Sequence, residues 1–465
     1  MPAKNTLSSG GCSAVNCINR FLTTPGYIMA IMLLSVLSNA LGLELPVYSI
    51  YVLTFAYICL FGEDLLPIIP IVVACYIAPS VQNNPGRNEN SVFAPEQGGI
   101  YLVCLGAIAA AVFLIRIIRD RKIFFGRKYK LLPGMLVLSA AYLLGGIGSN
   151  NYTDHALKSI LFALLNSATI LLPYFALAGG VNWTKARKDY LAWSGFGIGC
   201  ALLCQIAWIY LTGNVIRDGV IQRQFIYTGW GIYNNMGALL AMVIPFPFYL
   251  AAQYRKGWIG TLAGSLFFVG VLLTCSRGSI LCGGGIYFLC VVLMLYYAND
   301  RKANTLTVIL FMGCLAALLS LFSKPLMNLF SSLLDRGLDP SNRDTIYRDG
   351  WALFSKYPVF GGSFFSTEYA PWGWSTVESF TNFLPPRWHN TIVQLLASCG
   401  IVGLGAYVLH RAQTALLFVH DRKPEKIFAA ASILVLLACS LFDCHFFNIG
   451  PVLFYSMTLA FAENN

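Results

Sequence analysis

Apolar runs of roughly 18 residues or more recur from one end of the chain to the other, and they constrain its fold more than any other feature. A helix of about 20 apolar residues crosses the ~30 Å hydrocarbon core of a bilayer and satisfies its own backbone hydrogen bonds there. Only 11% of the residues are charged, whereas a soluble domain carries roughly 25%. The sequence therefore predicts an all-α polytopic membrane protein and excludes a soluble catalytic domain.

The apolar runs predict about fourteen transmembrane helices. They are expected near residues 26–44, 46–62, 64–80, 99–118, 131–148, 157–181, 191–212, 230–252, 258–275, 279–298, 305–322, 389–410, 427–442 and 449–462. Most of the intervening loops are short, but residues 323–388 form one long loop. We therefore expect three parts: helices 1–11 in residues 1–322, a long extracytoplasmic loop in residues 323–388, and helices 12–14 in residues 389–465.

Lys and Arg concentrate in short loops on one side of this arrangement, near residues 116–130, 182–190 and 411–426. Cytoplasmic loops carry an excess of these residues, while long extracytoplasmic loops are largely exempt from the rule. Both termini are therefore expected in the cytoplasm. The same distribution explains the formal net charge of +11, so the expected surroundings are membrane lipids and no nucleic-acid partner is predicted.

The cysteines give no sign of a metal site or a disulfide framework. The fourteen cysteines are scattered, most of them lie inside apolar runs, and no two form a CxxC pair. Such residues are expected to pack as small buried hydrophobes. The sequence also lacks a Walker A motif or a Gly-rich phosphate loop, and it predicts no cofactor.

Arg277 is the sharpest candidate for binding an anion. It lies in Ser276-Arg277-Gly278, a tight turn between two long apolar helices on the outer side. A charge near hydrocarbon costs roughly 2.5–3.5 kcal/mol on insertion scales, so a functional anionic partner is the favoured interpretation. The alternative is that Arg277 snorkels to the headgroups of the outer leaflet.

Three further arginines are expected on the outer side, namely Arg217 and Arg223 in the loop 213–228 and Arg343 in the long loop. For Arg217 and Arg223 a solvated or lipid-facing role is an equal alternative, and the role of Arg343 is open. A guanidinium stays charged and binds phosphate oxygens through paired hydrogen bonds. Several arginines that converge outside the membrane would suit a diphosphate.

His389 is the candidate general base. It stands in Arg387-Trp388-His389-Asn390, where the long loop meets the twelfth predicted span. A neutral imidazole at the positive end of a helix dipole can accept a proton near physiological pH. The alternative is a helix-start residue that hydrogen-bonds to the loop. The other histidines are expected elsewhere: His410 and His420 on the basic cytoplasmic side, and His155 and His445 beside Asp154 and Asp443 as capped surface or interface residues.

The long loop contains one predicted helix, which should pack as a lid along the membrane surface. The helix begins near Ser341, and residues 343–356 place Tyr347, Trp351 and Phe354 on one face. It should end before Tyr357-Pro358, with Gly361-Gly362 turning the chain. Two tryptophans that follow are either belt residues at the interface or platforms that stack on sugar rings: Trp372 and Trp374.

Several of these segments together resemble a known family. They comprise Arg343-Asp344, Trp351-Ala352-Leu353, Tyr357-Pro358-Val359-Phe360-Gly361-Gly362, His389-Asn390-Thr391 and Cys399-Gly400-Ile401-Val402-Gly403-Leu404, with Tyr233-Asn234-Asn235-Met236-Gly237-Ala238 and Ser276-Arg277-Gly278 upstream. In their order and membrane side, these motifs resemble the O-antigen ligase and O-antigen polymerase superfamily. The resemblance covers roughly residues 213–410.

The resemblance implies a GT-C-like membrane glycosyltransferase that uses no metal. Such enzymes take a glycan from undecaprenyl diphosphate on the outer face of the bacterial inner membrane and transfer it to a glycan or lipid acceptor. By matching position, His389 would activate the acceptor hydroxyl, while Arg277 and either Arg217 or Arg223 would hold the diphosphate. The chain departs from the usual ligase in having more predicted spans.

Polysaccharide polymerase is the preferred function, because of the extra spans and a loop large enough for an acceptor glycan. The alternative within the same family is an O-antigen ligase, which transfers the glycan to a lipid or protein. A lipid-linked oligosaccharide flippase is the alternative from another class. Transporters often show internal repeats and charged residues in mid-span, and this sequence shows no clear repeat.

Overall fold

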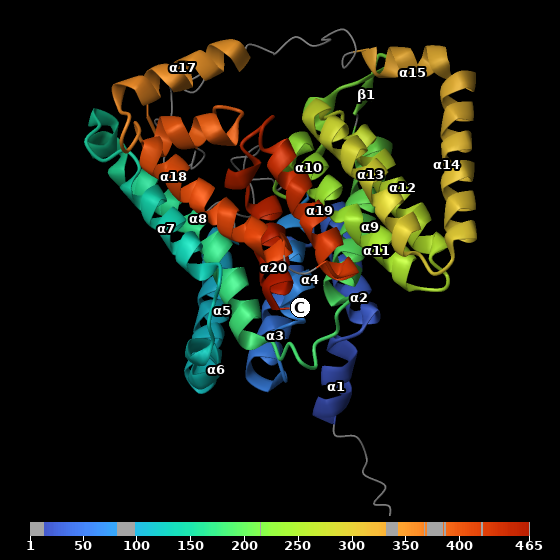
Figure 1. Ribbon diagram of the computed structural model, residues 1–465, viewed down its shortest axis with the longest axis horizontal. Coiled ribbons are helices and arrows are strands. Elements are labelled where there is room, and N and C mark those ends of the chain that lie inside the picture. Colours follow the sequence, from blue (N-terminus) through green and yellow to red (C-terminus); the bar gives the residue numbers. More distant parts are fainter. Residues whose placement is uncertain are drawn as a thin grey trace, which may run out of the picture.

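The computed structural model describes residues 14–80, 98–213, 215–331, 343–366, 368–369, 385, 387–419 and 422–464. It is helical almost throughout, which confirms the predicted all-α polytopic class (Figure 1). Each predicted span coincides with a helix or with two consecutive helices. Two short antiparallel hairpins interrupt the run of helices between residues 212 and 233. In one, β1 (Ile216–Arg217) pairs with β2 (Val220–Ile221); in the other, β3 (Tyr227–Thr228) pairs with β4 (Gly231–Ile232).

The helices follow one another along the chain as the sequence pattern orders them. Before the long loop they are α1 (Ala14–Leu22), α2 (Pro25–Leu41), α3 (Glu44–Phe61), α4 (Ile68–Ile77), α5 (Ile100–Arg119), α6 (Arg121–Gly126), α7 (Leu132–Leu144), α8 (Asn150–Gly180), α9 (Tyr190–Thr212), α10 (Tyr233–Val243), α11 (Pro245–Gln253), α12 (Trp258–Leu273), α13 (Arg277–Tyr297) and α14 (Arg301–Leu321). In the loop and after it they are α15 (Ser323–Leu329), α17 (Arg343–Lys356), α18 (Thr391–Val419), α19 (Pro424–Cys439) and α20 (Ile449–Asn464). Two short 3₁₀ helices are η2 (Arg223–Phe225) and η3 (His445–Phe447).

Fewer helices reach the length of a full span than the apolar runs suggested. Among the described residues, eight are long and apolar enough to cross a membrane, or nine if α1 and α2, bent by 73°, form one span. Other predicted spans are shorter helices, such as α4 with 10 residues and α7 with 13. At 1.5 Å per residue these measure about 15 and 20 Å, less than the ~30 Å hydrocarbon core. A helix therefore lies at each of the fourteen predicted spans, and eight of these spans reach the length of a full crossing.

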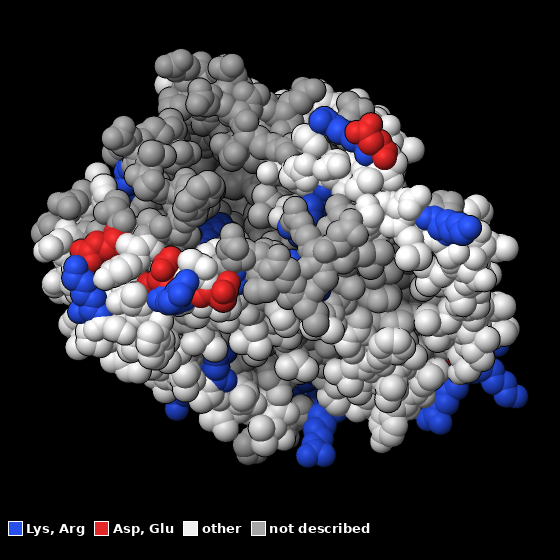
Figure 2. Space-filling view, turned by 90° about the horizontal axis from the view of Figure 1, so that it is seen from above, with Lys and Arg blue, Asp and Glu red and all other residues white. Residues whose placement is uncertain are grey.

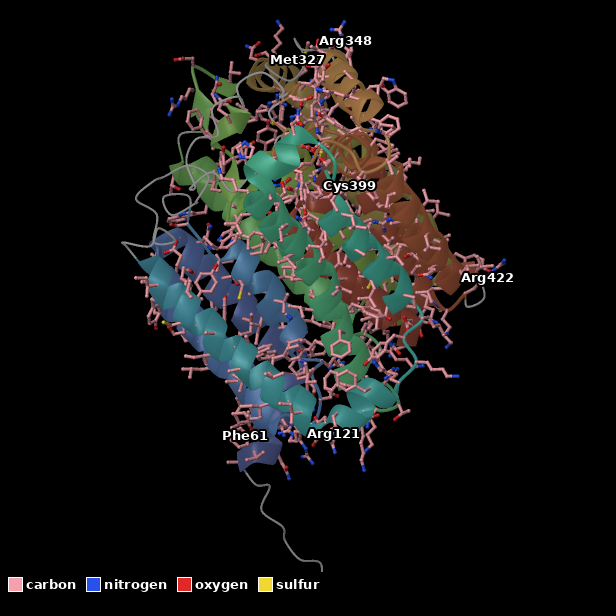
Figure 3. The ribbon with its side chains drawn as sticks, turned by 90° about the vertical axis from the view of Figure 1, so that its left-hand side faces the viewer. Phe61, Arg121, Met327, Arg348, Cys399 and Arg422 are labelled. Carbon is pink, nitrogen blue, oxygen red and sulfur yellow. The ribbon has the colours of Figure 1, made fainter. Side chains whose placement is uncertain are left out.

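The two ends of the bundle carry different elements. α17, α15 and β1 lie at one end, and α6 lies at the other (Figure 1). In the side view Met327 and Arg348 mark the first end, whereas Phe61 and Arg121 mark the second (Figure 3). We call these the α17 end and the α6 end.

α17 packs against the start of α18 through a face that the sequence pattern did not indicate. Leu353 is completely buried against Trp388, with Ile346 and Tyr357 beside it. Trp351, by contrast, is 58% exposed. The predicted aromatic face is therefore not the packed one, since the buried residues of the helix are Gly350 and Leu353, with Ile346 and Tyr357 partly buried on the same side. The helix ends at Lys356, as predicted, and its expected start near Ser341 lies outside the described residues.

The segment after α17 hydrogen-bonds to the backbone of α18, which is broken at Gly400. Gly400 has φ 63° and ψ −160°, a conformation essentially restricted to glycine. The backbone N–H of Ile401 donates to Pro358 O at 2.9 Å, and that of Gly362 donates to Ala397 O at 2.7 Å. A Cβ on Gly400 would lie 2.3 Å from Val359 O. Gly362 and Gly400 therefore have a structural role, because they allow the segment after α17 to pair closely with the broken helix α18.

Gly400→Ala is expected to destabilise the protein by roughly 2 kcal/mol or more, because it combines a glycine-only backbone conformation with a clash against a carbonyl. Gly405→Ala is the matched control, since Gly405 lies on the same helix and a Cβ there would meet nothing within 4 Å. Thermal unfolding of both variants in detergent measures the difference. Equal midpoints for the two variants would contradict this role for Gly400.

α18 also continues past residue 410, where its predicted span ends. It runs to Val419, so His410 and Arg411 belong to the helix and not to a cytoplasmic loop. His410 is completely buried, and its Nε2 lies 2.9 Å from the hydroxyl of Tyr455. His410 is therefore buried inside the bundle and does not lie on a basic surface, because Tyr455 of α20 packs against this part of α18. His420 lies outside the described residues.

Candidate active site

His389 lies at the junction of the long loop and α18, as predicted, and its backbone is unusual there. Its φ is +48°, in the left-handed region that costs a non-glycine residue roughly 1–2 kcal/mol. Asn390 caps α18, because its Oδ1 accepts hydrogen bonds from the backbone N–H groups of Ile392 (2.8 Å) and Val393 (3.2 Å). The hydroxyl of Tyr347 on α17 donates to the His389 carbonyl at 3.2 Å. Strain held in place by several such contacts is characteristic of functional sites.

The imidazole of His389 pairs with a buried carboxylate. Its Nδ1 lies 3.2 Å from Oδ1 of Asp443, which follows α19 and is only 4% exposed. The same carboxylate accepts a hydrogen bond from Nδ2 of Asn234 at 2.8 Å and from the backbone N–H of Cys444 at 2.7 Å. Three groups thus hold the carboxylate in place, and the carboxylate in turn fixes the Nδ1 edge of the imidazole.

The environment of Asp443 keeps it ionised. Burial raises the pKa of Asp443, but the hydrogen bond from His389 and the positive charges around it, Arg387 among them, lower that pKa well below its usual range. A carboxylate can only accept hydrogen bonds, so Nδ1 of His389 carries the hydrogen. Nε2 of the neutral imidazole is then the atom left to accept a proton. This is the arrangement that a histidine general base requires.

Sequence reasoning missed this pair. It considered Asp443 only as a neighbour of His445, which was expected as a capped surface or interface residue. Both residues are buried, and the carboxylate contacts His389, because the packing of α18 on α19 decides the contact. The backbone N–H of Thr391 donates to Ser440 O at 2.9 Å, which brings the start of one helix to the end of the other. No local signal in the sequence reports this contact.

A second polar network lies beside the pair. Asn448 accepts a hydrogen bond from Nη1 of Arg387 at 2.6 Å, and its Nδ2 donates to Oδ1 of Asn235 at 2.6 Å. The same Nδ2 lies 3.3 Å from Nδ1 of His445, and burial lowers the pKa of His445. Arg387 is therefore a further cation near Asp443 that the sequence prediction did not include. The only signal for it was its position two residues before His389.

Arg277 opens α13, and the first turn of that helix lies against the Asp443 loop. A Cβ on Gly278 would lie 2.7 Å from the Cβ of Phe442, the residue before Asp443. The hydroxyl of Ser279 donates to Asn234 O at 3.4 Å. Arg277 is half-buried, which fits a side chain at a helix start that borders the site and does not extend freely into solvent. The structure therefore brings Arg277 into the neighbourhood of the His389–Asp443 pair.

Arg223 approaches the same neighbourhood from the hairpin loop. Its guanidinium lies 5.0 Å from the centre of the Tyr233 ring, next to the Asn234 that holds Asp443. Cys275, two residues before Arg277, has a φ of +52° and packs in the same small hydrophobic cluster as Phe225 and Tyr233. Arg223 and Arg277 thus approach residues 233–234 from two different elements, η2 and the start of α13.

The other predicted residues divide into two groups. Arg343 opens α17 one turn before Tyr347, whose hydroxyl contacts the His389 carbonyl. Arg217 is exposed on β1 and stacks on Phe225, with 4.1 Å between its guanidinium and the ring centre, so it belongs to the hairpin. The candidate sugar platforms lie outside the described residues: Trp372 and Trp374.

Charged side chains of both signs are exposed at the α17 end. Seen from that end, Lys and Arg side chains come into view near the middle of the face, and Asp and Glu lie farther out (Figure 2). Positive charge near the middle of this end would favour an anionic ligand there.

A comparison with protein families matches part of the chain that carries the site. Residues 262–408 match the family model described as O-antigen ligase. This segment is an O-antigen ligase domain. It includes Arg277, Arg343 and His389, whereas Asn234 and Asp443 lie outside the matched residues. A comparison with curated proteins found no match.

Residues 262–408 are thus similar to O-antigen ligases. The described part of the chain also has eight helices long and apolar enough to cross a membrane, as a multi-pass membrane protein of that kind requires. The pair of His389 with a carboxylate from beyond the matched segment means that the site of this O-antigen ligase domain is completed by α10 and by the α19–α20 connection.

Proposed function

We propose that the protein transfers a glycan from undecaprenyl diphosphate to an acceptor hydroxyl, with His389 as general base. The observation that carries the proposal is the contact between His389 Nδ1 and Asp443 Oδ1 at 3.2 Å, beside two arginines. Nε2 takes the proton from the acceptor hydroxyl as its oxygen attacks the anomeric carbon. Asp443 keeps the imidazole in the required tautomer and stabilises the imidazolium that forms, a role known for the carboxylate of Ser-His-Asp triads.

The leaving group supplies the second half of the reaction. The bond between the anomeric carbon and the diphosphate oxygen breaks, and the diphosphate departs with the bonding electrons. Arg277 and Arg223 would stabilise the charge that builds on it, and Arg343 and Arg387 are further cations within reach of this region. Because guanidinium groups supply the positive charge, the proposed step involves no metal.

We assign the α17 end to the extracytoplasmic face of the bacterial inner membrane. The short basic segments support this orientation, since α5 ends in Arg116 and Arg119, and α6 begins with Arg121 at the opposite end. Both chain termini would then be cytoplasmic, and residues 323–388 would form an extracytoplasmic part between two groups of transmembrane helices. The donor would be reached from the outer leaflet.

Polymerase is the activity we favour within the family, and the support for it is the long segment between α14 and α18. Incubation of the purified protein with a lipid-linked repeat unit tests the proposal. A ladder of products identifies a polymerase, transfer only to an added lipid or protein acceptor identifies a ligase, and intact donor in both cases contradicts the proposed function.

Arg277→Ala is expected to lower kcat/KM by about 10–10²-fold, because a charge-assisted hydrogen bond to phosphate contributes roughly 1.5–3 kcal/mol. Arg277→Lys should fall between Ala and wild type, since it keeps the charge and loses the paired donors. Arg217→Ala is the control, because Arg217 is exposed on the hairpin. The assay is glycan transfer at matched protein amounts. An Arg277→Ala variant as active as the control would exclude Arg277 from the diphosphate site.

A further inference from the structure

Arg411 lies inside the bundle, enclosed by aromatic rings. Its guanidinium carbon is 4.6 Å from the ring centre of Tyr407, 4.2 Å from that of Phe446 and 4.7 Å from that of Tyr455. Its Nη1 donates to the Tyr455 hydroxyl at 2.6 Å. No ion pair of Arg411 with Asp or Glu occurs in the part of the chain that the structure describes. Ring faces, not a carboxylate, therefore offset its charge.

The three rings come from three different elements. Tyr407 is on α18 with Arg411 itself, Tyr455 is on α20, and Phe446 is in η3, the short helix that joins α19 to α20. The rings also contact one another, with 5.3 Å between the centres of Tyr407 and Phe446 and 5.6 Å between those of Phe446 and Tyr455. Arg411 is the centre of this cluster, because its guanidinium lies within 4.7 Å of all three ring centres.

Phe446 links the cluster to the site. It lies three residues after Asp443, and the intervening turn is closed by backbone hydrogen bonds: Phe447 N–H donates to Cys444 O at 2.9 Å and Asn448 N–H to His445 O at 3.1 Å. A displacement of Phe446 would therefore move the turn that carries the Asp443 carboxylate. That carboxylate has to stay within hydrogen-bond distance of His389. His389 lies just before α18, the helix that carries Arg411.

We infer that Arg411 is a positioning residue for the His389–Asp443 pair and acts through Phe446. Its flat guanidinium clamps η3 between α18 and α20, and this fixes the carboxylate where it orients the imidazole. A planar cation is suited to this task, because it stacks on several ring faces and donates in its plane to the Tyr455 hydroxyl. Lysine keeps the charge and lacks the plane. The effect on turnover rests on the proposed function of His389, whereas the effect on η3 does not.

Arg411→Lys tests the inference directly. We expect kcat to fall by up to about 10²-fold, the effect of misplacing a catalytic group by about 1 Å, while the donor KM stays within about twofold of wild type. The control is Arg116→Lys on α5, because Arg116 is also buried but lies toward the α6 end, where its Nη1 donates to Gly62 O at 2.8 Å. A kcat for Arg411→Lys equal to that of Arg116→Lys would overturn the inference.

A double-mutant cycle separates positioning from a general loss of structure. In an Asp443→Asn background, Arg411→Lys should cause little further loss of kcat, since the contact that it supports is already gone. The same fold-loss in both backgrounds would mean that Arg411 acts on the whole fold, and would contradict the inference.

Amide hydrogen exchange supplies a readout that does not depend on activity. Exchange in residues 440–448 should be faster in Arg411→Lys than in wild type and unchanged in Arg116→Lys. Unchanged exchange in this segment would sink the inference even if glycan transfer were impaired. If the wild-type protein transferred no glycan, the proposed function would fail while this measurement would still decide whether Arg411 holds η3.

Discussion

His389→Ala lowers turnover by about 10²–10⁴-fold and leaves donor affinity nearly unchanged, if the imidazole is the base that takes the acceptor proton. The reason is geometric. Nδ1 of His389 contacts Asp443, so Nε2 is available for the acceptor, and no charge of the imidazole is needed to hold the diphosphate. Turnover and donor binding of the purified variant are therefore to be measured together, at matched protein amounts.

Two further variants make this experiment decisive. His389→Asn keeps a residue type that tolerates the left-handed backbone at position 389, so it removes the imidazole without adding backbone strain. It should be as inactive as His389→Ala. His155→Ala, on α8, removes a histidine that contacts neither Asp443 nor Asn234 among the described hydrogen bonds, and should retain activity. A collapse of donor affinity with turnover near wild type would make His389 a binding residue.

Asp443→Asn should be nearly as damaging as the loss of His389, with turnover lowered by about 10²–10⁴-fold. An amide at position 443 can present its NH₂ group to Nδ1, which favours the tautomer with hydrogen on Nε2. That tautomer cannot accept the acceptor proton at the required atom. The protein should still fold, because the amide fills the same space and Asn234 can still hydrogen-bond to it. Glycan transfer and thermal unfolding are the two measurements.

The control for Asp443 is its hydrogen-bond partner. Asn234→Ala removes the bond to Oδ2 but leaves both the bond from Cys444 N–H and the pair with His389, so it should cost far less turnover than Asp443→Asn. A fully active Asp443→Asn variant would show that the carboxylate is structural, and His389 would then act without an orienting partner.

Local signals in the sequence were sufficient to predict much of the candidate site. The loop helix ends at Lys356 because Tyr357-Pro358 cannot continue it, and His389 precedes α18 because Asn390 is a strong helix cap. Both features depend on residues within a few positions of one another. For the same reason the expected helix at each apolar run was found.

Contacts between distant segments could not be predicted in this way. Asp443 is 54 positions from His389, and its sequence neighbour His445 offered a simpler and incorrect partner. The buried face of α17 likewise depends on Trp388 and Val393, which pack against it. The spacing of apolar residues within α17 does not indicate these partners.

Arg411 shows why charge alone misplaced the end of α18. A cation after an apolar run usually marks the membrane boundary, and a charge near the bilayer centre costs roughly 2.5–3.5 kcal/mol. A desolvated cation–π contact contributes about 2 kcal/mol, so three rings are enough to offset that cost. The rings lie on α18, η3 and α20, and only the folded chain brings them together.

The pairing of residues 358–363 with the break at Gly400 bears on how a genetic screen of this protein should be interpreted. Substitutions at Gly361, Gly362 and Gly400 would score as inactive beside those at His389 and Asp443, although the glycines act by allowing close packing within the protein. The two groups would differ in abundance, because cells would degrade the glycine variants, whereas the variants at His389 and Asp443 would accumulate as folded but inactive protein. An immunoblot of membranes would therefore sort motif residues into those that build the enzyme and those that perform its chemistry.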